Sequence, residues 1–260
     1  MLKMAEGFFK TDRPTLTTML KSTTAEGLIS EIGEAIKQGT DALLFQMETL
    51  VPEDRTKENY KRVFYAMRGK PSYVTNYIRG NALPKTDEEL TEELFFAREC
   101  GATLIDIRGD LFDRQPGEFT ENPEAVKKQK EVIREFKALG AEVLMSSHIL
   151  KYTPGEQVLK IAIAQEERGA DVAKVVTEAN SEAELLDNFR TTILLHEKLS
   201  CSSLFLCNGS HCARHRLLAP LMGGGKNMFL TVVNSFEGAA QPKIERAKEI
   251  LTFGGFTDLP

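Results

Sequence analysis

Short apolar, β-branched runs alternate with longer charged segments along the whole chain, and this alternation constrains the fold most. Eight runs are present, at 15–19, 42–46, 73–77, 103–107, 142–146, 172–176, 204–207 and 228–233. The stretches with helical spacing of apolar residues are 24–38, 54–67, 86–100, 123–139, 154–168, 181–199, a shorter one near 216–222, and 242–251. The runs therefore predict strands, and the longer stretches predict helices.

Eight strand–helix units without a two-strand hairpin signal imply parallel strands joined by helical crossovers. Such units close naturally into a (β/α)8 barrel of about 250 residues, close to the 260 residues present. A doubly wound open sheet is the runner-up, but it usually has a glycine-rich turn after its first strand. Here that turn, 20–24, reads LKSTT. The sequence thus predicts an α/β protein, a single (β/α)8 TIM-barrel domain over residues 1–260.

Charge and composition exclude several classes of partner. The chain has 33 Lys and Arg against 38 Asp and Glu, a net charge of -5, which argues against nucleic acid or an anionic membrane surface. It lacks an apolar run near the roughly 20 residues of a membrane span, and its first residues do not resemble a secretory signal. We therefore expect a cytoplasmic protein whose four cysteines are reduced thiols.

Lys174 is the most informative single residue. The active site of such a barrel lies at the carboxyl ends of the strands, and Lys174 sits inside the apolar run 172–176. Burial lowers the pKa of a lysine and makes its amine able to form a Schiff base with a carbonyl. The alternatives are a lysine that points outward with its head in water, or a structural ion pair. His148 ends the neighbouring fifth run, so an imidazole can meet this amine at the same mouth and move protons.

These stretches resemble type I 3-dehydroquinate dehydratase, a Schiff-base (β/α)8 enzyme of the shikimate pathway. The matching residues are MSSH at 145–148, then Lys151, Thr153 and Pro154, and ADVAK at 170–174. The resemblance extends from about Pro14 to Ile250. It implies that Lys174 forms the Schiff base and that His148 is the catalytic histidine. It also implies a homodimer that acts on a small-molecule keto acid without a cofactor.

Further positions follow from the same resemblance. Arg216 matches an arginine that binds the substrate carboxylate, and a guanidinium suits that group. Gln241 matches a glutamine on a loop that closes over substrate. The family's preceding serine is matched most nearly by Ser235 or Glu237. On the residues alone, Arg216 is equally consistent with a surface arginine and Gln241 with a helix-capping residue.

The hydroxyl-recognising half of the family's pocket is rewritten in this chain. A Glu-x-Arg pattern on the second strand is replaced by Leu44, Phe45 and Gln46, and an arginine ending the third strand is replaced by Tyr77. Arg79 can substitute only if its loop turns back over the mouth. In addition, the usual Asp-x-Glu of the fourth strand reads DIR at 106–108, so Arg108 stands in place of a glutamate. The glutamate that hydrogen-bonds the catalytic histidine has no counterpart in 78–82.

We therefore predict Schiff-base dehydration of a cyclic hydroxy-keto carboxylic acid by Lys174 and His148, with Arg216, Gln241, Gln46, Tyr77, Arg79 and Ser235 around the substrate. Because the pocket is rewritten, turnover of 3-dehydroquinate itself should be far below that of a typical family member. Alternatives are a Schiff-base aldolase acting on another hydroxy-keto acid and a non-catalytic metabolite-binding barrel.

Two further motifs are weaker signals. Cys207, His211, Cys212 and His215 contain zinc-binding residue types at a non-standard spacing, so a metal-dependent lyase is a third class. GGGK at 223–226 is read as a helix-to-strand turn, because it lacks the Walker spacing of a phosphate loop.

Overall fold

A computed structural model describes residues 7–82, 84–222, 227–234 and 240–260, and in these residues the strands form one eight-stranded parallel sheet. The strand order is β7-β6-β5-β4-β3-β2-β1-β8. The bounds are β1 Thr15–Met19, β2 Ala42–Gln46, β3 Ser72–Thr75, β4 Leu104–Arg108, β5 Glu142–His148, β6 Val172–Glu178, β7 Ser202–Asn208 and β8 Met228–Thr231. The first strand pairs with the last, as in a barrel, and the β7–β8 seam is the one not bridged by a ladder among the described residues. The predicted (β/α)8 barrel is confirmed.

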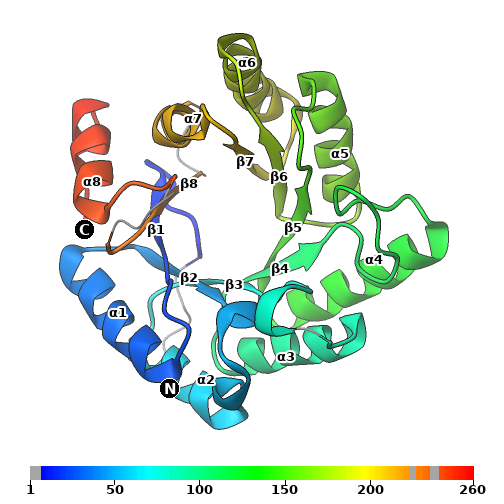
Figure 1. Cartoon of the computed structure of the whole chain (residues 1–260), viewed down its shortest axis with the longest axis vertical. Helices are drawn as coiled ribbons and strands as arrows, with labels where there is room; N and C mark the ends of the chain where they lie inside the picture. Colours follow the sequence, from blue (N-terminus) through cyan, green and yellow to red (C-terminus); the bar gives the residue numbers. More distant parts are fainter. Residues whose placement is uncertain (1–6, 83, 223–226, 235–239) are drawn as a thin grey trace.

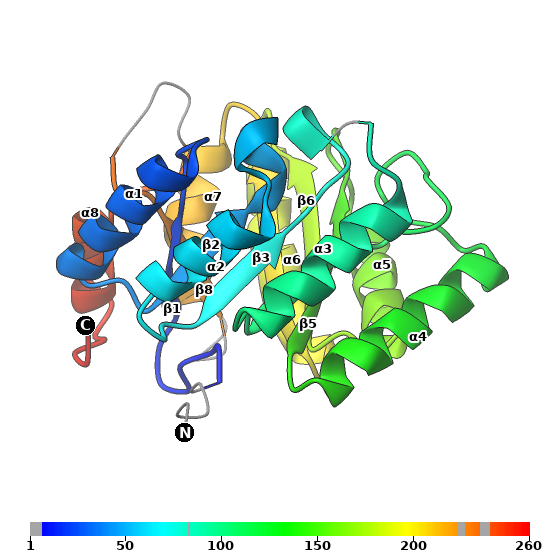
Figure 2. The same cartoon turned by 90° about the horizontal axis from the view of Figure 1, so that it is seen from below.

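Helices alternate with the strands and surround them (Figure 1). Their bounds are α1 Ala25–Gln38, α2 Lys57–Ala66, α3 Asp87–Glu99, α4 Pro123–Ala138, α5 Gly155–Glu167, α6 Glu182–Lys198, α7 Cys212–Leu218 and α8 Ile244–Phe253. The side view shows β6 pointing away from the end of the molecule where the described N-terminal segment lies (Figure 2). The mouth of the barrel is thus the end opposite the described N-terminal segment.

The alternation of side chains along each strand separates two cores. On β6, Ala173 and Val175 pack outward against α5 and α6, while Val172 and Val176 belong to the cluster inside the barrel. Since successive side chains of a strand point to opposite faces, Lys174 faces the barrel interior. Phe8 belongs to the same interior cluster, and its backbone N–H donates to Glu142 at the start of β5, so Phe8 closes the amino end.

Local signals account for several element ends. Thr86 and Glu89 form the capping box expected at the start of α3. The seventh helix differs from the prediction, since it spans Cys212–Leu218 rather than 216–222. Proline disfavours the interior of an α-helix, and Pro220 instead lies in a short 3-10 turn, Ala219–Leu221. The predicted turn at 223–226 lies outside the described residues.

Among the described residues, no helix is long and apolar enough to cross a membrane.

Candidate active site

Lys174 is buried inside the barrel and surrounded by hydroxyl groups and a carboxylate. Its Nζ donates to the Tyr77 hydroxyl at 2.8 Å and to the Tyr73 hydroxyl at 2.9 Å. Nζ also lies 3.4 Å from Asp106 Oδ2. Both phenols donate to that same oxygen, Tyr77 at 2.5 Å, while Ser146 donates to Asp106 Oδ1 at 2.6 Å. We call these five residues the lysine cluster: Lys174, Tyr73, Tyr77, Asp106 and Ser146.

The lysine cluster changes the acidity of its members. Burial lowers the pKa of Lys174 because the barrel interior disfavours the ammonium ion, and the charge of Asp106 only partly opposes this. Burial, and then the charge of Asp106, raise the pKa of Tyr73 and Tyr77 well above 10.0. The two phenols are therefore neutral hydrogen-bond donors beside an amine that loses its proton more readily than an exposed lysine.

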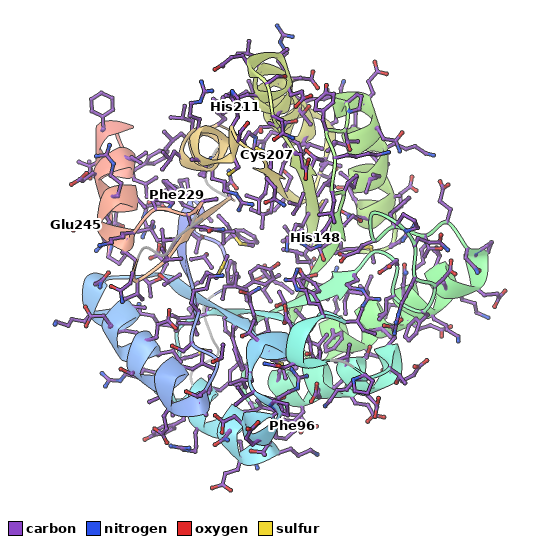
Figure 3. All side chains as sticks on the ribbon, in the orientation of Figure 1. Phe96, His148, Cys207, His211, Phe229 and Glu245 are labelled. Atoms are coloured by element: carbon purple, nitrogen blue, oxygen red, sulfur yellow. The ribbon has the colours of Figure 1, made fainter. Side chains whose placement is uncertain are left out.

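His148 stands at the carboxyl end of β5, one strand from Lys174, and Figure 3 labels it on the inner side of the ring of helices. Its Nδ1 lies 2.5 Å from Glu118 Oε2. With Nδ1–H donated to this carboxylate, the neutral ring carries its lone pair on Nε2, which can then accept a proton. The carboxylate that orients the histidine thus comes from the connection after β4. The family resemblance places the corresponding glutamate after β3.

A hydrogen-bonded clasp holds the connection that carries Glu118. The backbone carbonyl of Glu118 accepts from Ser147 Oγ at 2.9 Å, one residue before His148. At the end of α5, Arg168 donates to the carbonyls of Gly109 at 3.0 Å and Thr120 at 2.5 Å, near the two ends of the connection. Glu118 itself has a φ of +51°, in the left-handed region that favours glycine. The surrounding contacts therefore impose this conformation and direct the carboxylate at the histidine.

His148 and Lys174 are coupled through Tyr77. The ring of Tyr77 packs edge-on against that of His148 with 5.2 Å between centroids, and its hydroxyl contacts Lys174. Burial, and then the nearby charge of Lys174, lower the pKa of His148 below 6.5, while Glu118 opposes the shift. The pKa of Glu118 is lowered even though burial opposes it, because His148 donates to it and positive charges lie nearby. The imidazole is therefore neutral, as a general base must be.

Arg79 does turn back over the mouth, as its proposed role requires. Its guanidinium lies 4.4 Å from the Tyr77 ring centroid, and its Nη2 lies 3.2 Å from Glu48 Oε1. Glu48 is itself fully buried, and the Thr75 hydroxyl donates to its carboxylate, with Oγ1 2.9 Å from Oε2 and 3.1 Å from Oε1. Arg79 remains half exposed. A carboxylate–guanidinium pair is thus present at the mouth, although the second strand lacks the family pattern.

Arg216 lies on α7, and its guanidinium reaches the carboxyl end of β7. Its Nε donates to Cys207 O at 3.0 Å and its Nη2 to Asn208 Oδ1 at 2.9 Å, and it forms no ion pair with a carboxylate among the described residues. Burial lowers the pKa of Arg216. Arg108, by contrast, is neutralised by Asp87 and Asp110. Of the two arginines, Arg216 is the one available to pair with an anion.

For the other predicted substrate-binding residues, the structure gives at most a position in the fold. Gln46 ends β2 and continues the inward-facing positions of Ala42 and Leu44. Gln241 is partly buried in the segment before α8. Ser235 lies outside the described residues.

The cysteine–histidine motif is dispersed in the structure. The His215 ring is buried between Phe189 and Phe205, with Thr192 3.2 Å from its Nε2, while His211 contacts Ser210 and Glu182. No group of three or more His, Cys, Asp or Glu side chains that could hold a metal occurs in the described part of the chain.

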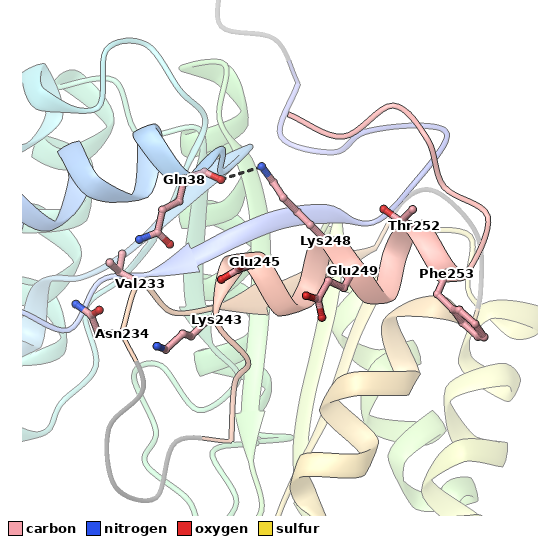
Figure 4. A pocket seen from close by; sticks show the side chains of 9 residues that line it. All are labelled: Gln38, Val233, Asn234, Lys243, Glu245, Lys248, Glu249, Thr252 and Phe253. Carbon is pink, nitrogen blue, oxygen red and sulfur yellow. Dashed lines mark hydrogen bonds between the residues drawn. The ribbon is translucent and has the colours of Figure 1, made fainter.

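A surface hollow of about 970 Å³ lies along α8, lined by residues that include Gln38, Lys243 and Lys248 (Figure 4). It contains no member of the lysine cluster.

Asp106 and Ser146 can be recognised in the sequence as polar residues at the ends of the fourth and fifth strands, whereas sequence reasoning missed Glu118 and Tyr73. Tyr73 reads as an ordinary core residue of the third strand. Glu118 lies in the connection 109–122, whose length was the available signal, since connections longer than about 12 residues are frequently functional.

No protein-family model matches this sequence, and a search of curated proteins finds no match. Solved structures do resemble the chain. A 3-dehydroquinate dehydratase from Geobacillus kaustophilus HTA426 has a TM-score of 0.79 at 18% identity, over 95% of this chain and 93% of that one. A type I 3-dehydroquinate dehydratase from Clostridium difficile has a TM-score of 0.75 at 15% identity, over 96% and 94%. A 3-dehydroquinate dehydratase from Enterococcus faecalis has a TM-score of 0.73 at 16% identity, over 97% of this chain and 96% of that one. The chain therefore shares the barrel fold of the 3-dehydroquinate dehydratases over nearly its whole length.

Proposed function

We propose that this protein is a lyase that forms a Schiff base between Lys174 and the keto group of a cyclic hydroxy-keto carboxylic acid, and then eliminates water. The observation that carries the proposal is the buried amine of Lys174, hydrogen-bonded at 2.8 Å to Tyr77, whose ring contacts His148. Burial lowers the pKa of this amine, as an imine-forming lysine requires.

The imine turns the substrate into an electron sink. His148 Nε2 removes the proton on the carbon next to the imine carbon. The electrons of that C–H bond form a C=C bond, while the π electrons of the C=N bond move to the nitrogen to give an enamine. The enamine then expels the β-hydroxyl group, to which His148 returns the proton as water leaves. Glu118 keeps the histidine in the tautomer that performs both transfers. Hydrolysis of the product imine regenerates Lys174.

Borohydride reduction tests the proposal directly. The protein is incubated with 3-dehydroquinate, or with pyruvate as a smaller keto acid, and treated with sodium borohydride. A reduced imine adds the mass of the keto acid less one oxygen, and peptide mapping should place it on Lys174. Product analysis separates water loss from carbon–carbon cleavage. A protein unmodified by either keto acid would overturn the proposal.

The pH dependence of the reaction should show the influence of Glu118. Only neutral His148 accepts a proton, so the rate rises with pH through the pKa of His148, which is lowered from 6.5. The negative charge of Glu118 raises this pKa, so Glu118→Gln should move the rise to still lower pH. It should also reduce the rate at the plateau by about tenfold, because orientation by the carboxylate is weakened.

Rate–pH profiles of the wild type and Glu118→Gln check this prediction. Glu121→Gln provides the control, because Glu121 is an exposed carboxylate in the same connection. A Glu118→Gln profile that coincides with the wild type would contradict the assigned role.

Arg216 should hold the substrate carboxylate. A hydrogen bond to a charged group contributes about 1.5–3 kcal/mol, so Arg216→Met should raise the keto acid concentration for half-maximal adduct formation by roughly 10- to 100-fold. The measurement is adduct yield against concentration. The methyl ester of the same keto acid is the control, since it lacks the anion and should be bound alike by both proteins. An equal loss for acid and ester would contradict carboxylate binding.

A further inference from the structure

We propose that the Tyr77 hydroxyl is a catalytic group that carries a proton between Lys174 and Asp106 while the imine forms, and this inference rests on the proposed function. Imine formation needs a proton to leave the ammonium ion before attack and a proton to reach the departing hydroxyl afterwards. The lysine cluster contains a path for both transfers.

The hydrogen bonds of the cluster have the directions that a relay needs. Lys174 Nζ donates to the Tyr77 hydroxyl at 2.8 Å, and this hydroxyl donates in turn to Asp106 Oδ2 at 2.5 Å. The direct separation from Nζ to that oxygen is 3.4 Å, longer than either bond through the phenol. Each of the two proton transfers through Tyr77 therefore spans a shorter distance than a single direct transfer from Nζ to the carboxylate.

Tyr73 provides a second phenol between the same two groups, but its position differs. Tyr73 lies within β3 and belongs to the cluster of apolar side chains inside the barrel, with Leu104 and Leu144. Tyr77 lies beyond the end of β3, with Arg79 over its ring and the ring of His148 against its edge. The Tyr77 hydroxyl is thus on the mouth side of the amine, where substrate must approach. Tyr73 is on the deep side.

The relay balances in protons and charge. One proton moves from the Lys174 ammonium through Tyr77 to Asp106, leaving a neutral amine and a protonated carboxyl group. The amine lone pair bonds to the keto carbon, and one N–H proton moves to the former carbonyl oxygen to give a neutral carbinolamine. Asp106 then returns its proton through Tyr77 to the carbinolamine hydroxyl. The C–O bond breaks, water leaves, and the nitrogen lone pair forms the iminium double bond, with Asp106 again a carboxylate.

A pair of matched variants tests this assignment. Tyr77→Phe and Tyr73→Phe each remove one hydroxyl that contacts both Lys174 and Asp106. Each protein is mixed with 3-dehydroquinate or pyruvate, whichever modifies the wild type faster. The reaction is quenched with borohydride at successive times, and intact mass gives the rate of imine formation. Tyr77→Phe should slow this rate on the order of 100-fold, as loss of an acid–base group does. Tyr73→Phe should slow it at most about tenfold, as loss of one hydrogen bond does.

Each possible result either supports or overturns the proton relay through Tyr77. Equal slowing by the two variants would mean that the phenols only set the surroundings of the amine, and an unslowed Tyr77→Phe would remove Tyr77 from the reaction; either result overturns the relay. A wild type that forms no adduct overturns the proposed function as well. If Tyr77→Phe fails to fold, fluorinated tyrosine at position 77 replaces it. A relay must respond to the greater acidity of that phenol, whereas a rate unchanged by fluorination overturns the relay.

Discussion

Lys174→Met should abolish the borohydride-trapped adduct and lower turnover by on the order of 10,000-fold or more, because the covalent intermediate cannot form. Methionine nearly matches the lysine side chain in length and is readily accommodated in an apolar interior. Asp106 still receives hydrogen bonds from Tyr73, Tyr77 and Ser146 in this variant. The fold should therefore persist, and loss of activity can be attributed to the missing amine.

Intact mass after borohydride treatment, steady-state turnover and thermal unfolding together check this result. Lys160→Met is the matched control, because Lys160 is exposed on α5 and its ion-pair partner among the described residues is the exposed Glu121. That variant should form the adduct at the wild-type rate. An adduct that persists in Lys174→Met would place the Schiff base on another lysine and remove the basis of the proposed chemistry.

His148→Asn should separate the two halves of the reaction. The amine of Lys174 and its partners are unchanged, so an imine with the intact substrate still forms. Removal of the proton next to the imine loses its general base, and turnover should fall by about 100- to 10,000-fold. The trapped species should accordingly shift from a mixture with dehydrated product to the undehydrated adduct, which is heavier by one water.

Mass spectrometry of the trapped protein during turnover makes this measurement. His196→Asn serves for comparison. His196 lies on α6, outside the lysine cluster, and burial lowers its pKa as it does that of His148. It should leave the adduct composition unchanged. If His148→Asn turned over at the wild-type rate, another group would have to be the base.

The fold was predictable because its determinants are local and repeated. Each strand is a short apolar run and each helix has its own periodicity, so the eight units could be recognised independently. Lys174 and His148 were predictable for a related reason, since each interrupts or ends an apolar run and the barrel brings the ends of neighbouring strands together.

The partners of these two residues were harder to predict because long-range contacts select them. Glu118 is 30 residues from His148 in sequence, and Tyr73 is 101 residues from Lys174. Neither separation leaves a periodic signal. Arg79 illustrates the same limit, because the turn that brings it over Tyr77 depends on the path of the loop and not on its composition.

The left-handed backbone at Glu118 favours activity at the expense of thermal stability. A left-handed conformation costs a residue other than glycine roughly 1–2 kcal/mol, and glycine would avoid that cost. Glycine has no carboxylate to offer His148, however. Directed evolution for heat resistance alone would therefore tend to replace Glu118 and discard the orientation of the base, so heat selection of this protein should be coupled to a screen for turnover.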